Sequence, residues 1–535
     1  MQTQGTFTQY EGLECWEKAT FGDLCQRWAK EYGKQTALVC GEERISYQEL
    51  EEQSTSLAYG FLEIGLKKGM YVAFQLANHN DMVIALMALL KIGAVPILFL
   101  PNHREQELLP ICELVEPAMY LVEQEYQGFT YDSLIEKLKM ACPSVQKIVV
   151  QGGDGRYPDL ESLMKKSRGE KLPTVYPDDL AILLLSGGST GVPKLIPRCH
   201  EDYVYINRIC AKAANLNAKS RYLVGLPAEH NFSLGCPGIF GTLDCGGQVI
   251  FCEYPSPDEI LELIEQEQVT ITAIVPTMAA MCLELMEWDE TYDVSSLQIL
   301  QIGGALLEPS LACKVVERKF GALQQVYGTT EGLFMVTTPE DDMETITTTQ
   351  GRPLGEQIDV RIVDENGNDM GIGESGELIC KGPYTISGYY MAEEANKESF
   401  TADGFYRTGD KAMRLSNGTY RVLGRVKEQI NRAGEKITPA EVEEFLCRDP
   451  RIKEAVVVGV PDAILGHRIC AFVRPKETMV TLPQVKQHFQ TLGVAAYKYP
   501  DQLEEILQWP MTKVGKIDRN ALVKQAEGKT WITEN

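Results

Sequence analysis

A short loop rich in glycines and hydroxyls is the part of this sequence best suited to hold phosphate groups. It covers residues 186–194 and follows the apolar residues 180–185, which predict a buried strand. Glycines let backbone N–H groups approach phosphate oxygens, and Lys194 adds a positive charge. A Walker A loop would end in Gly-Lys-Ser/Thr, whereas two residues separate Gly191 from Lys194 here. The loop therefore predicts ATP binding in a fold other than that of the P-loop NTPases.

The charge of the chain argues against nucleic acid or a membrane as a partner. Its 535 residues include 75 acidic and 51 basic side chains, which gives a formal net charge of -24. Such a chain repels nucleic acid and anionic lipid, and no basic cluster offsets the repulsion. An anionic substrate must therefore be met by lysines and arginines placed within the site itself.

Cysteine and histidine usage indicates a reducing compartment and suggests no zinc site. The 15 cysteines and 6 histidines are scattered, and no Cys-x-x-Cys pair occurs. The N-terminal residues do not resemble a signal peptide, and the strongest apolar run, residues 82–90, is too short to span a bilayer. We expect a cytoplasmic protein in which this run forms a buried helix followed by a buried strand.

The elements that must position the loop alternate between helical and strand patterns. The capping box Ser46-Tyr47-Gln48-Glu49 predicts the start of a helix, and residues 71–76 predict the next strand. Strands are also predicted at residues 248–251 and 271–275, on either side of a helix at 257–268. This alternation favours an α/β fold with largely buried sheets, and the length suggests three or four folding units.

The pattern changes after about residue 350. Short strands are predicted at residues 360–363, 376–380 and 419–423, and beyond residue 424 at 455–460 and 469–473. Thr438-Pro439-Ala440-Glu441 supplies a cap, a proline at the first helical position and a glutamate at the third. We therefore expect an N-terminal domain at residues 1–424 and a small α+β domain at 425–535. The short charged joint suits a hinge, with a rigid junction as the alternative.

Five segments occur in the order found in the adenylate-forming enzymes, which include acyl-CoA synthetases, luciferases and adenylation domains of peptide synthetases. They are residues 184–194, 327–331, 406–410, 424–430 and 510–517. The chain resembles this family over essentially its whole length. The resemblance implies a large N-terminal domain with mixed sheets and flanking helices, plus a small mobile α+β C-terminal domain. It also implies an enzyme that uses ATP and Mg²⁺ to activate a carboxylic acid.

The resemblance assigns a role to each segment. It implies that the loop holds the β- and γ-phosphates, Tyr327 stacks on adenine, Glu331 binds Mg²⁺, Asp410 binds the ribose hydroxyls and Lys427 is the hinge. The implied nucleotide-binding residues are Ser186, Gly187, Gly188, Ser189, Thr190, Gly191, Lys194, Gly303, Gly304, Ala305, Tyr327, Gly328, Thr330, Glu331, Asp410, Arg425 and Lys516. Taken singly, Asp410 could instead cap a turn, Lys516 could be an ordinary exposed lysine, and residues 186–191 could be an ordinary surface loop.

The chemistry explains why these residue types are needed. The carboxylate of the acid attacks the α-phosphorus of ATP and expels pyrophosphate, so two anions must meet. The implied catalytic residue, Lys516, would bridge the two and lower their repulsion. Mg²⁺ held by Glu331 would neutralise the charge that develops on pyrophosphate.

Residues 227–238 resemble the aryl acid branch of the family, the 2,3-dihydroxybenzoate–AMP and salicylate–AMP ligases. Members that activate amino acids carry an aspartate where Asn231 stands, and a neutral amide suits an acid without an amine. The alternative is a structural amide that bonds the backbone. Residues 195–198 with His200, 298–305, 382–386 and 495–498 strengthen this match. The implied acid-binding residues are His230, Asn231, Phe232, Cys236, Gly304, Phe334 and Lys516.

The choice of acid depends on two positions. Dihydroxybenzoate enzymes usually carry serine where Cys236 stands, and a thiol is a poor partner for a 3-hydroxyl. Phe334 stands where a smaller side chain is usual and should shrink the pocket. Both favour salicylate over 2,3-dihydroxybenzoate, although Ser233 and Gly235 also depart from the common pattern. A heteroaromatic acid such as 3-hydroxypicolinate stays open.

The resemblance implies transfer of the aryl group to the phosphopantetheine thiol of a separate aryl carrier protein, as in siderophore or nonribosomal peptide biosynthesis. Residues 432–436 would line the path of the thiol. The alternatives are an aryl-CoA ligase that uses free CoA and a non-catalytic aryl acid sensor. We expect a monomer or a homodimer.

Overall fold

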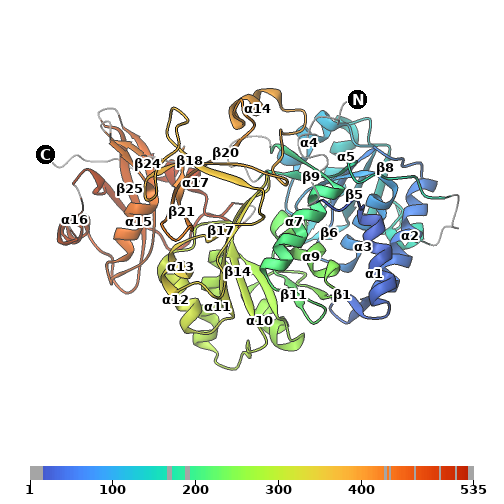
Figure 1. The fold of residues 1–535 in the computed structure, drawn as a ribbon, viewed down its shortest axis with the longest axis horizontal. Helices are drawn as coiled ribbons and strands as arrows, with labels where there is room; N and C mark the ends of the chain where they lie inside the picture. The colour runs from blue at the N-terminus through green and yellow to red at the C-terminus, as the bar shows by residue number, and fades with distance from the viewer. Residues whose placement is uncertain are drawn as a thin grey trace. The chain divides into compact units, whose positions relative to one another are not determined.

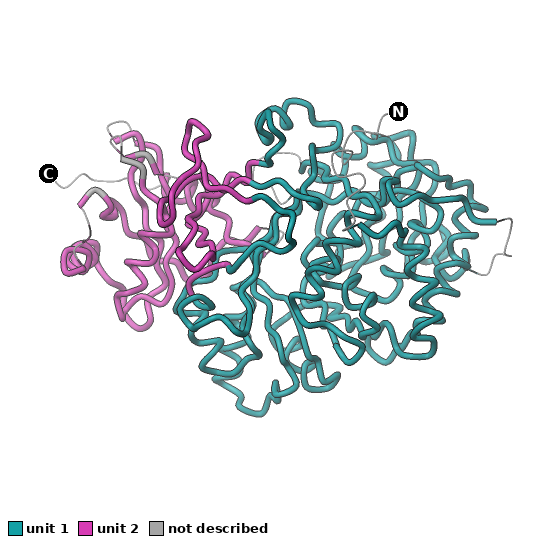
Figure 2. Tube along the Cα trace, in the orientation of Figure 1, with its two compact units in different colours: residues 1–347, 351–359, 380–406 teal, residues 348–350, 360–379, 407–535 magenta. Residues whose placement is uncertain are grey.

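The described chain falls into two compact units (Figure 2). The computed structural model describes residues 16–164, 171–186, 193–426, 430–432, 435–462, 465–492, 494, 496–512 and 515–527. Unit 1 contains the described residues up to 347 together with 351–359 and 380–406. Unit 2 contains residues 348–350 and 360–379 and the described residues from 407 onward.

The first sheet of unit 1 has six strands. Their order is β10 (Leu195–Cys199), β9 (Leu180–Leu185), β4 (Val95–Leu98), β3 (Tyr71–Gln75), β5 (Met119–Glu123) and β8 (Lys147–Gln151). The strands from β9 to β8 run parallel, whereas β10 is antiparallel to β9. The run of apolar residues in β9 fits a strand buried within such a sheet.

The second sheet of unit 1 has nine strands. Their order is β17 (Arg352–Pro353), β16 (Leu333–Val336), β15 (Ala322–Thr329), β14 (Ile299–Gly303), β13 (Ile271–Ile274), β11 (Arg221–Val224), β12 (Gln248–Phe251), β1 (Thr36–Cys40) and β2 (Glu43–Ser46). All strands from β15 to β1 are parallel, so their carboxyl ends meet at one edge of the sheet. A small hairpin, β6 (Glu125–Tyr126) and β7 (Phe129–Thr130), lies outside both sheets.

Helices cover both sheets (Figure 1). They are α1 (Phe21–Tyr32), α2 (Tyr47–Glu63), α3 (Asn80–Ile92), α4 (Glu105–Val115), α5 (Asp132–Ala141), α6 (Leu160–Met164), α7 (His200–Ala213), α8 (Asn231–Gly235), α9 (Gly238–Asp244), α10 (Pro257–Gln266), α11 (Pro276–Trp288), α12 (Pro309–Glu317), α13 (Met343–Thr348) and α14 (Glu393–Ser399). Apolar side chains of α10, α11 and α12 pack on the nine-stranded sheet, and those of α4 and α5 pack on the six-stranded sheet. Helix α3 is buried along almost its whole length and contacts both β4 and β1. It therefore joins the two sheets.

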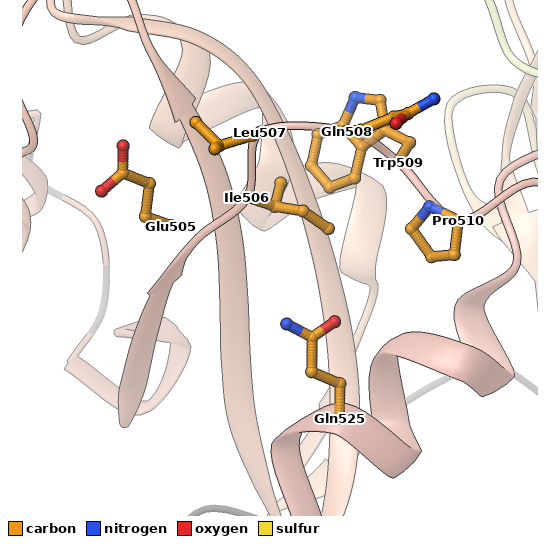
Figure 3. A pocket seen from close by; sticks show the side chains of 7 residues that line it. All are labelled: Glu505, Ile506, Leu507, Gln508, Trp509, Pro510 and Gln525. Carbon is orange, nitrogen blue, oxygen red and sulfur yellow. The ribbon is translucent and has the colours of Figure 1, made fainter.

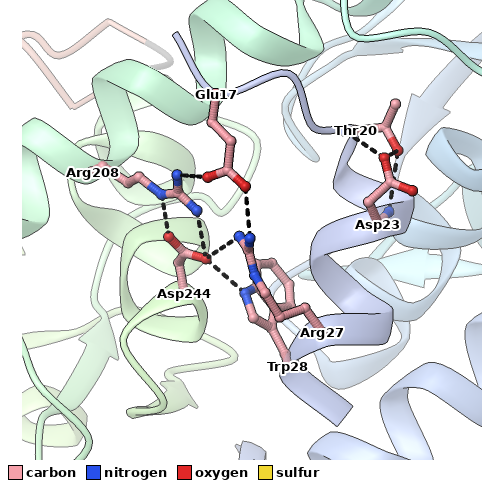
Figure 4. A network of polar contacts seen from close by, with 7 residues as sticks. All are labelled: Glu17, Thr20, Asp23, Arg27, Trp28, Arg208 and Asp244. Atoms are coloured by element: carbon pink, nitrogen blue, oxygen red, sulfur yellow. Dashed lines mark hydrogen bonds and ion pairs between the residues drawn. The ribbon is translucent and has the colours of Figure 1, made fainter. Parts of the chain in front are cut away.

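A charged network fixes α1 to α7 and α9 (Figure 4). Arg208 of α7 pairs with Glu17 and with Asp244 of α9, the latter at 2.6 Å between Nε and Oδ2. The indole N–H of Trp28 donates to Asp244 at 2.8 Å, and Arg27 pairs with Glu17 at 2.6 Å. Burial opposes ionisation of Glu17, but hydrogen bonds from Arg27 and Arg208 prevail and hold its pKa below the usual value. The first helix is thereby held against the core of unit 1.

Unit 2 contains two smaller sheets. One has the order β18 (Asp359–Val363), β19 (Ser375–Lys381), β20 (Tyr406–Arg414) and β21 (Tyr420–Arg425); the other has the order β23 (Glu435–Ile437), β22 (Ile430–Arg432), β25 (Gly466–Pro475) and β24 (Ile452–Asp462), with β26 (Gln502–Glu505) paired to β25. Helices α15 (Pro439–Cys447) and α16 (Leu482–Thr491) pack with one apolar cluster of the second sheet, and α17 (Arg519–Glu527) packs with another. A short 3₁₀ helix covers Ala496–Lys498.

Most predicted elements are confirmed. Helix α2 begins at the capping box of Ser46 and Glu49, and the apolar run at 82–90 forms α3, followed by β4. Helix α15 does begin at Pro439, but the side chain of Thr438 makes no cap hydrogen bond, so the predicted cap is wrong in that detail. None of the described helices is long and apolar enough to cross a membrane.

The compact units divide the chain differently from the predicted domains. Residues 360–379 and 407–424 belong to unit 2, because β20 pairs with β21 and these strands share one sheet. Lys427 lies outside the described residues. A boundary after residue 424 and a hinge at Lys427 therefore stay predictions.

Candidate active site

The base of the predicted phosphate-binding loop is closed by two hydrogen bonds. The backbone N–H of Ser186 donates to the carbonyl of Lys194 at 2.9 Å, and the N–H of Lys194 donates to the Ser186 hydroxyl at 2.9 Å. The antiparallel pairing of β9 with β10 continues directly from this point. The predicted residues Gly187, Gly188, Ser189, Thr190 and Gly191 lie outside the described residues.

Tyr389 brings two predicted nucleotide-binding residues together. Glu331 lies between β15 and β16 with 8% of its surface exposed, and its Oε1 accepts a hydrogen bond from the Tyr389 hydroxyl at 2.8 Å. The ammonium of Lys194 lies 4.5 Å from the centroid of the Tyr389 ring. Burial and the charge of Glu331 raise the pKa of Tyr389, so the phenol keeps its proton and stays a donor. Lys194 and Glu331 therefore contact the same side chain.

The turn that carries Glu331 is pressed against residues 384–386. The N–H of Ile386 donates to the carbonyl of Glu331 at 2.8 Å, and the Thr385 hydroxyl donates to the carbonyl of Gly332 at 2.8 Å. Gly332 has φ 120°, and a Cβ at this position would lie 2.0 Å from the Tyr384 carbonyl oxygen. Only glycine fits here, so the close approach of the two segments is built into the sequence.

A buried ion pair also supports this turn. Arg198 of β10 pairs with Asp202 of α7 at 2.7 Å, and the two side chains are 1% and 0% exposed. The guanidinium also donates to the carbonyls of Tyr384 and Thr330, each at 2.7 Å. Burial raises the pKa of Asp202, although the charge of Arg198 opposes the shift. Because Thr330 directly precedes Glu331, Arg198 is a positioning residue for the site.

Several predicted residues meet at the carboxyl edge of the nine-stranded sheet. Gly303 ends β14, and a Cβ on Gly303 would lie 3.2 Å from the ring of Phe232. Gly328 of β15 pairs with Phe334 of β16, and a Cβ on Gly328 would lie 2.7 Å from the Phe334 ring. Gly304, Ala305 and Tyr327 adjoin these positions in the chain. The implied adenine-binding and acid-binding residues thus lie on neighbouring strands.

Asn231 lies at the centre of a buried polar cluster. It opens α8, and its Oδ1 accepts a hydrogen bond from the Tyr203 hydroxyl at 2.8 Å. Its Nδ2 donates to the sulfur of Cys236 at 3.6 Å. Within the part of the chain that the structure describes, the amide therefore bonds two side chains and not the backbone. His230 caps α8, since its Nδ1 accepts from the N–H of Phe232 at 3.2 Å.

Gly235 makes room for two side chains of α7. A Cβ on Gly235 would lie 2.5 Å from Oδ1 of Asn207 and 2.6 Å from the Tyr203 hydroxyl. Both polar atoms of the Asn207 side chain are buried without a hydrogen-bond partner among the described residues, as is the hydroxyl of Ser233. Ser233 and Gly235, which depart from the pattern usual in the aryl acid branch, thus lie next to a buried polar cluster that includes Tyr203 and Asn207 of α7.

The remaining predicted residues belong to unit 2. Asp410 of β20 pairs with Arg425 of β21 at 2.9 Å, and Arg425 also donates to the Thr408 carbonyl at 3.0 Å. The backbone of Lys516 closes a turn with Thr512, because the Thr512 N–H donates to the Lys516 carbonyl at 2.6 Å and the Lys516 N–H donates to the Thr512 hydroxyl at 3.1 Å. Asp410 and Arg425 thus form one cluster, and Lys516 lies on a separate turn.

The segment that leads to Lys516 passes a cavity of about 460 Å³ in unit 2 (Figure 3). The cavity is lined by Glu505, Ile506, Leu507, Gln508, Trp509, Pro510 and Gln525. The indole N–H of Trp509 donates to Glu454 of β24 at 2.5 Å. None of the predicted site residues lines this cavity, and the hydrogen bond from Trp509 to Glu454 fixes the start of the segment that leads to Lys516.

Comparison with known proteins decides the family. Residues 25–390 match the family described as AMP-binding enzyme, and residues 441–516 match the AMP-binding enzyme C-terminal domain. The chain belongs to the AMP-binding enzyme family. The predicted family, α/β fold class and enzyme class are confirmed, and adenylate-forming members of this family use ATP.

Similar AMP-binding enzymes match almost the whole chain. The 2,3-dihydroxybenzoate-AMP ligase of Bacillus subtilis is 42% identical over 514 residues, which cover 96% of this chain and 95% of that protein. The salicyl-AMP ligase / salicyl-S-ArCP synthetase of Mycobacterium tuberculosis is 38% identical, with 96% and 92% covered. The apo structure of Mycobacterium smegmatis MbtA is 36% identical with a TM-score of 0.74, and 97% of each chain is covered.

The structure places three residues of this AMP-binding enzyme at the site that were not predicted from the sequence. Arg198 was named only as part of a segment that resembles the family, and Tyr203 and Tyr389 were not named. Tyr203 and Asn207 lie four residues apart on α7, so their helical spacing is a signal for a shared polar face. Tyr389 offered no comparable local signal, because its contact with Glu331 bridges 58 positions of the chain.

Replacing Arg198 by methionine is expected to lower the free energy of unfolding by about 3–5 kcal/mol, because the carboxylate of Asp202 is left buried and unpaired. The double variant Arg198→Met/Asp202→Asn should recover part of this loss, and urea unfolding measures both. Arg318→Met is the matched control, since Arg318 pairs with Glu287 at the surface; it should change the value by less than about 1 kcal/mol. Equal losses for Arg198→Met and Arg318→Met would contradict the assigned role.

Proposed function

We propose that this enzyme activates a 2-hydroxyaryl carboxylic acid as its AMP ester and then passes the aryl group to the phosphopantetheine thiol of a separate carrier protein. The observation that carries the proposal is the buried cluster of Tyr203, Asn231 and Cys236, which offers neutral partners and no carboxylate for an amine. The printed names of the relatives, a 2,3-dihydroxybenzoate-AMP ligase and a salicyl-AMP ligase / salicyl-S-ArCP synthetase, support it. The free thiols of the described cysteines support a cytoplasmic reaction.

In the first step a carboxylate oxygen bonds to the α-phosphorus of ATP while the bond from that phosphorus to the β-phosphate oxygen breaks. Pyrophosphate leaves, and the loop closed by Ser186 and Lys194 would hold it. Lys516 would lie between the acid and the α-phosphate and reduce their repulsion. Glu331 would hold Mg²⁺, which neutralises charge on the leaving pyrophosphate. Tyr389 would orient Glu331 for this role.

In the second step the thiol of the carrier protein attacks the carbonyl of the aryl-AMP and AMP leaves. We propose that the part of unit 2 that follows Lys427 turns about this residue between the steps, so that Lys516 departs and residues 432–436 approach the thiol, while Asp410 and Arg425, which precede the hinge, stay in place. Asp410 and Arg425 would bind the ribose through both steps. Free CoA is the alternative acceptor.

The nature of the cluster favours a singly hydroxylated acid. The sulfur of Cys236 already accepts a hydrogen bond from the Asn231 side chain, and a thiol is a weak hydrogen-bond partner for a 3-hydroxyl group of the substrate. The ring of Phe334 on β16 covers Gly328 on β15, which narrows the space beside these two strands. Salicylate is therefore the proposed substrate, ahead of 2,3-dihydroxybenzoate and heteroaromatic analogues.

Exchange of labelled pyrophosphate into ATP with a panel of aryl acids tests the proposal directly. We expect exchange that depends on the acid and is fastest with salicylate. No exchange with any aryl acid would refute the activity. Comparing a carrier protein that bears phosphopantetheine with free CoA as acceptor then separates the two transfer reactions.

The Lys516→Ala variant should lose about 100–1,000-fold in the rate of adenylate formation, because a stabilising charge on the transition state is removed. Its affinity for ATP should change little. Pyrophosphate exchange and equilibrium ATP binding give the two quantities. Lys524→Ala, which removes an exposed lysine of α17, serves as the control. Loss of ATP binding as large as the loss of exchange would argue against a chemical role for Lys516.

The Tyr389→Phe variant should need about 10-fold more Mg²⁺ for half-maximal exchange, because the partner that orients Glu331 is lost. Tyr390→Phe is a closely matched control: the hydroxyl of Tyr390 lies 2.5 Å from that of Tyr71 and not at Glu331. If Tyr389→Phe and Tyr390→Phe needed the same Mg²⁺ concentration, the proposal that Tyr389 orients Glu331 as a metal ligand would be wrong.

The Cys236→Ser variant should raise kcat/KM for 2,3-dihydroxybenzoate relative to salicylate by about 10-fold, the effect of one neutral hydrogen bond. Steady-state kinetics with both acids measure the ratio. Cys313→Ser, a partly exposed cysteine of α12, is the control and should leave it unchanged. An unchanged ratio in Cys236→Ser would remove the basis for preferring salicylate.

A further inference from the structure

Three side chains that offer metal ligands meet near the end of β1. They are Cys40, the last residue of β1; His79, which caps the N-terminus of α3; and Glu253, which lies two residues after β12. One ligand atom from each of the three lies within 4.8 Å of the others, and the sulfur of Cys40 is 3.0 Å from Oε1 of Glu253. All three residues belong to unit 1.

We propose that Cys40, His79 and Glu253 bind a Zn²⁺ ion. A thiolate, an imidazole and a carboxylate are the three ligand types that zinc takes in proteins, and the sulfur selects against Mg²⁺ and Ca²⁺. Ligands at zinc distances on a tetrahedron are about 3.5 Å apart, so small side-chain rotations from the observed separations complete the site. His79 and Glu253 are only partly buried, which leaves room for water as the fourth ligand.

One buried amide, that of Asn78, holds the backbone next to His79 and Glu253. Nδ2 of Asn78 donates to the carbonyls of Leu226 at 3.0 Å and Cys252 at 2.9 Å, and Oδ1 accepts from the N–H of Ala228 at 2.8 Å. Asn78 directly precedes His79, and Cys252 directly precedes Glu253. The parallel register of Cys40 with Phe251 fixes the third ligand. The ligands are therefore positioned by the fold before any ion binds.

The neighbours of the cluster favour a cation. Oδ2 of Asp81 lies 3.5 Å from Nδ1 of His79, and Gln151 holds Asp81 in place through a hydrogen bond of 2.6 Å. A histidine that binds a metal through one ring nitrogen commonly donates the N–H of the other to a carboxylate. With Nε2 on the ion, Nδ1 of His79 would carry the proton and donate to Asp81, in place of the hydrogen bond that it accepts from the Asp81 N–H in the structure. Asp81 and Glu253 thus place two carboxylates beside one imidazole and one thiol.

The cluster shares no residue with the proposed adenylation site and lies three strands away from Gly303. Strands β13 and β11 lie between β14, which carries Gly303, and β12, which leads to Glu253. Three strand spacings make roughly 14 Å. His79 comes from the connection after β3 of the six-stranded sheet, whereas Cys40 and Glu253 follow strands of the nine-stranded sheet. A bound Zn²⁺ would therefore clamp the two sheets together, whatever acid the enzyme activates.

Metal titration of the full chain, after removal of metal with a chelator, tests this site. We expect one tightly bound Zn²⁺ per chain in competition with a chromophoric chelator, and a thiolate-to-metal charge-transfer band when Co²⁺ is used. Cys40→Ser should lose the band and weaken Zn²⁺ binding by more than about 100-fold, and Asp81→Asn should weaken it about 10–100-fold. Cys313→Ser should match the wild type in both measurements.

Two results would overturn the proposal: a wild-type chain that binds no Zn²⁺, or a Cys40→Ser variant that keeps the Co²⁺ band and the Zn²⁺ affinity. Glu253→Gln guards against misfolding of the cysteine variant, because it preserves size and should weaken binding while leaving the Co²⁺–thiolate band. Thermal unfolding provides a readout that does not depend on adenylation. Zn²⁺ should raise the melting temperature of the wild type and of Cys313→Ser, and raise it much less in Cys40→Ser.

Discussion

The buried guanidinium of Arg198 is the constraint on which the site in unit 1 depends. A buried guanidinium needs acceptors for its donors, and the two terminal nitrogens of Arg198 find them in Asp202 and in the carbonyls of Thr330 and Tyr384, whereas its Nε has no partner among the described residues. These partners come from three different parts of the chain. Satisfying one charge therefore draws the turn with Glu331 and the segment leading to Tyr389 to the same place.

The parallel part of the nine-stranded sheet supplies the second constraint. Because strands from β15 to β1 run in one direction, every connection that leaves their carboxyl ends emerges at the same edge. Gly303, the turn with Glu331 and the α8 segment share this edge with Cys40 and Glu253. The order of the strands then determines which of them become neighbours, so one edge can serve two unrelated purposes.

Local sequence patterns predicted many of the helices and strands, because the formation of these elements depends largely on residues close together in the sequence. The capping box at Ser46 and Glu49 and the apolar run of β9 need no tertiary information. Motifs also assigned roles to Glu331 and Asp410, and these roles stay predictions. The contacts of Tyr389 with Glu331 and of Tyr203 with Asn231 could not be predicted, since each joins segments distant in sequence. For the same reason, scattered cysteines and histidines argued against a zinc site, although a parallel sheet can gather Cys40 and Glu253 across two hundred residues.

The pairing of β1 with β12 also delays the completion of the nine-stranded sheet during protein synthesis. Leu38 pairs with Val249, so about 200 residues must be synthesised between the two partners. At ribosomal rates this takes roughly 10–40 s, during which the apolar strand β1 cannot occupy its final place. Until then β2 can pair with one edge of β1, but the other edge stays open and is a template for wrong pairing. The nine-stranded sheet thus makes the protein most vulnerable to aggregation while it is still being made, long before the finished enzyme meets its first substrate.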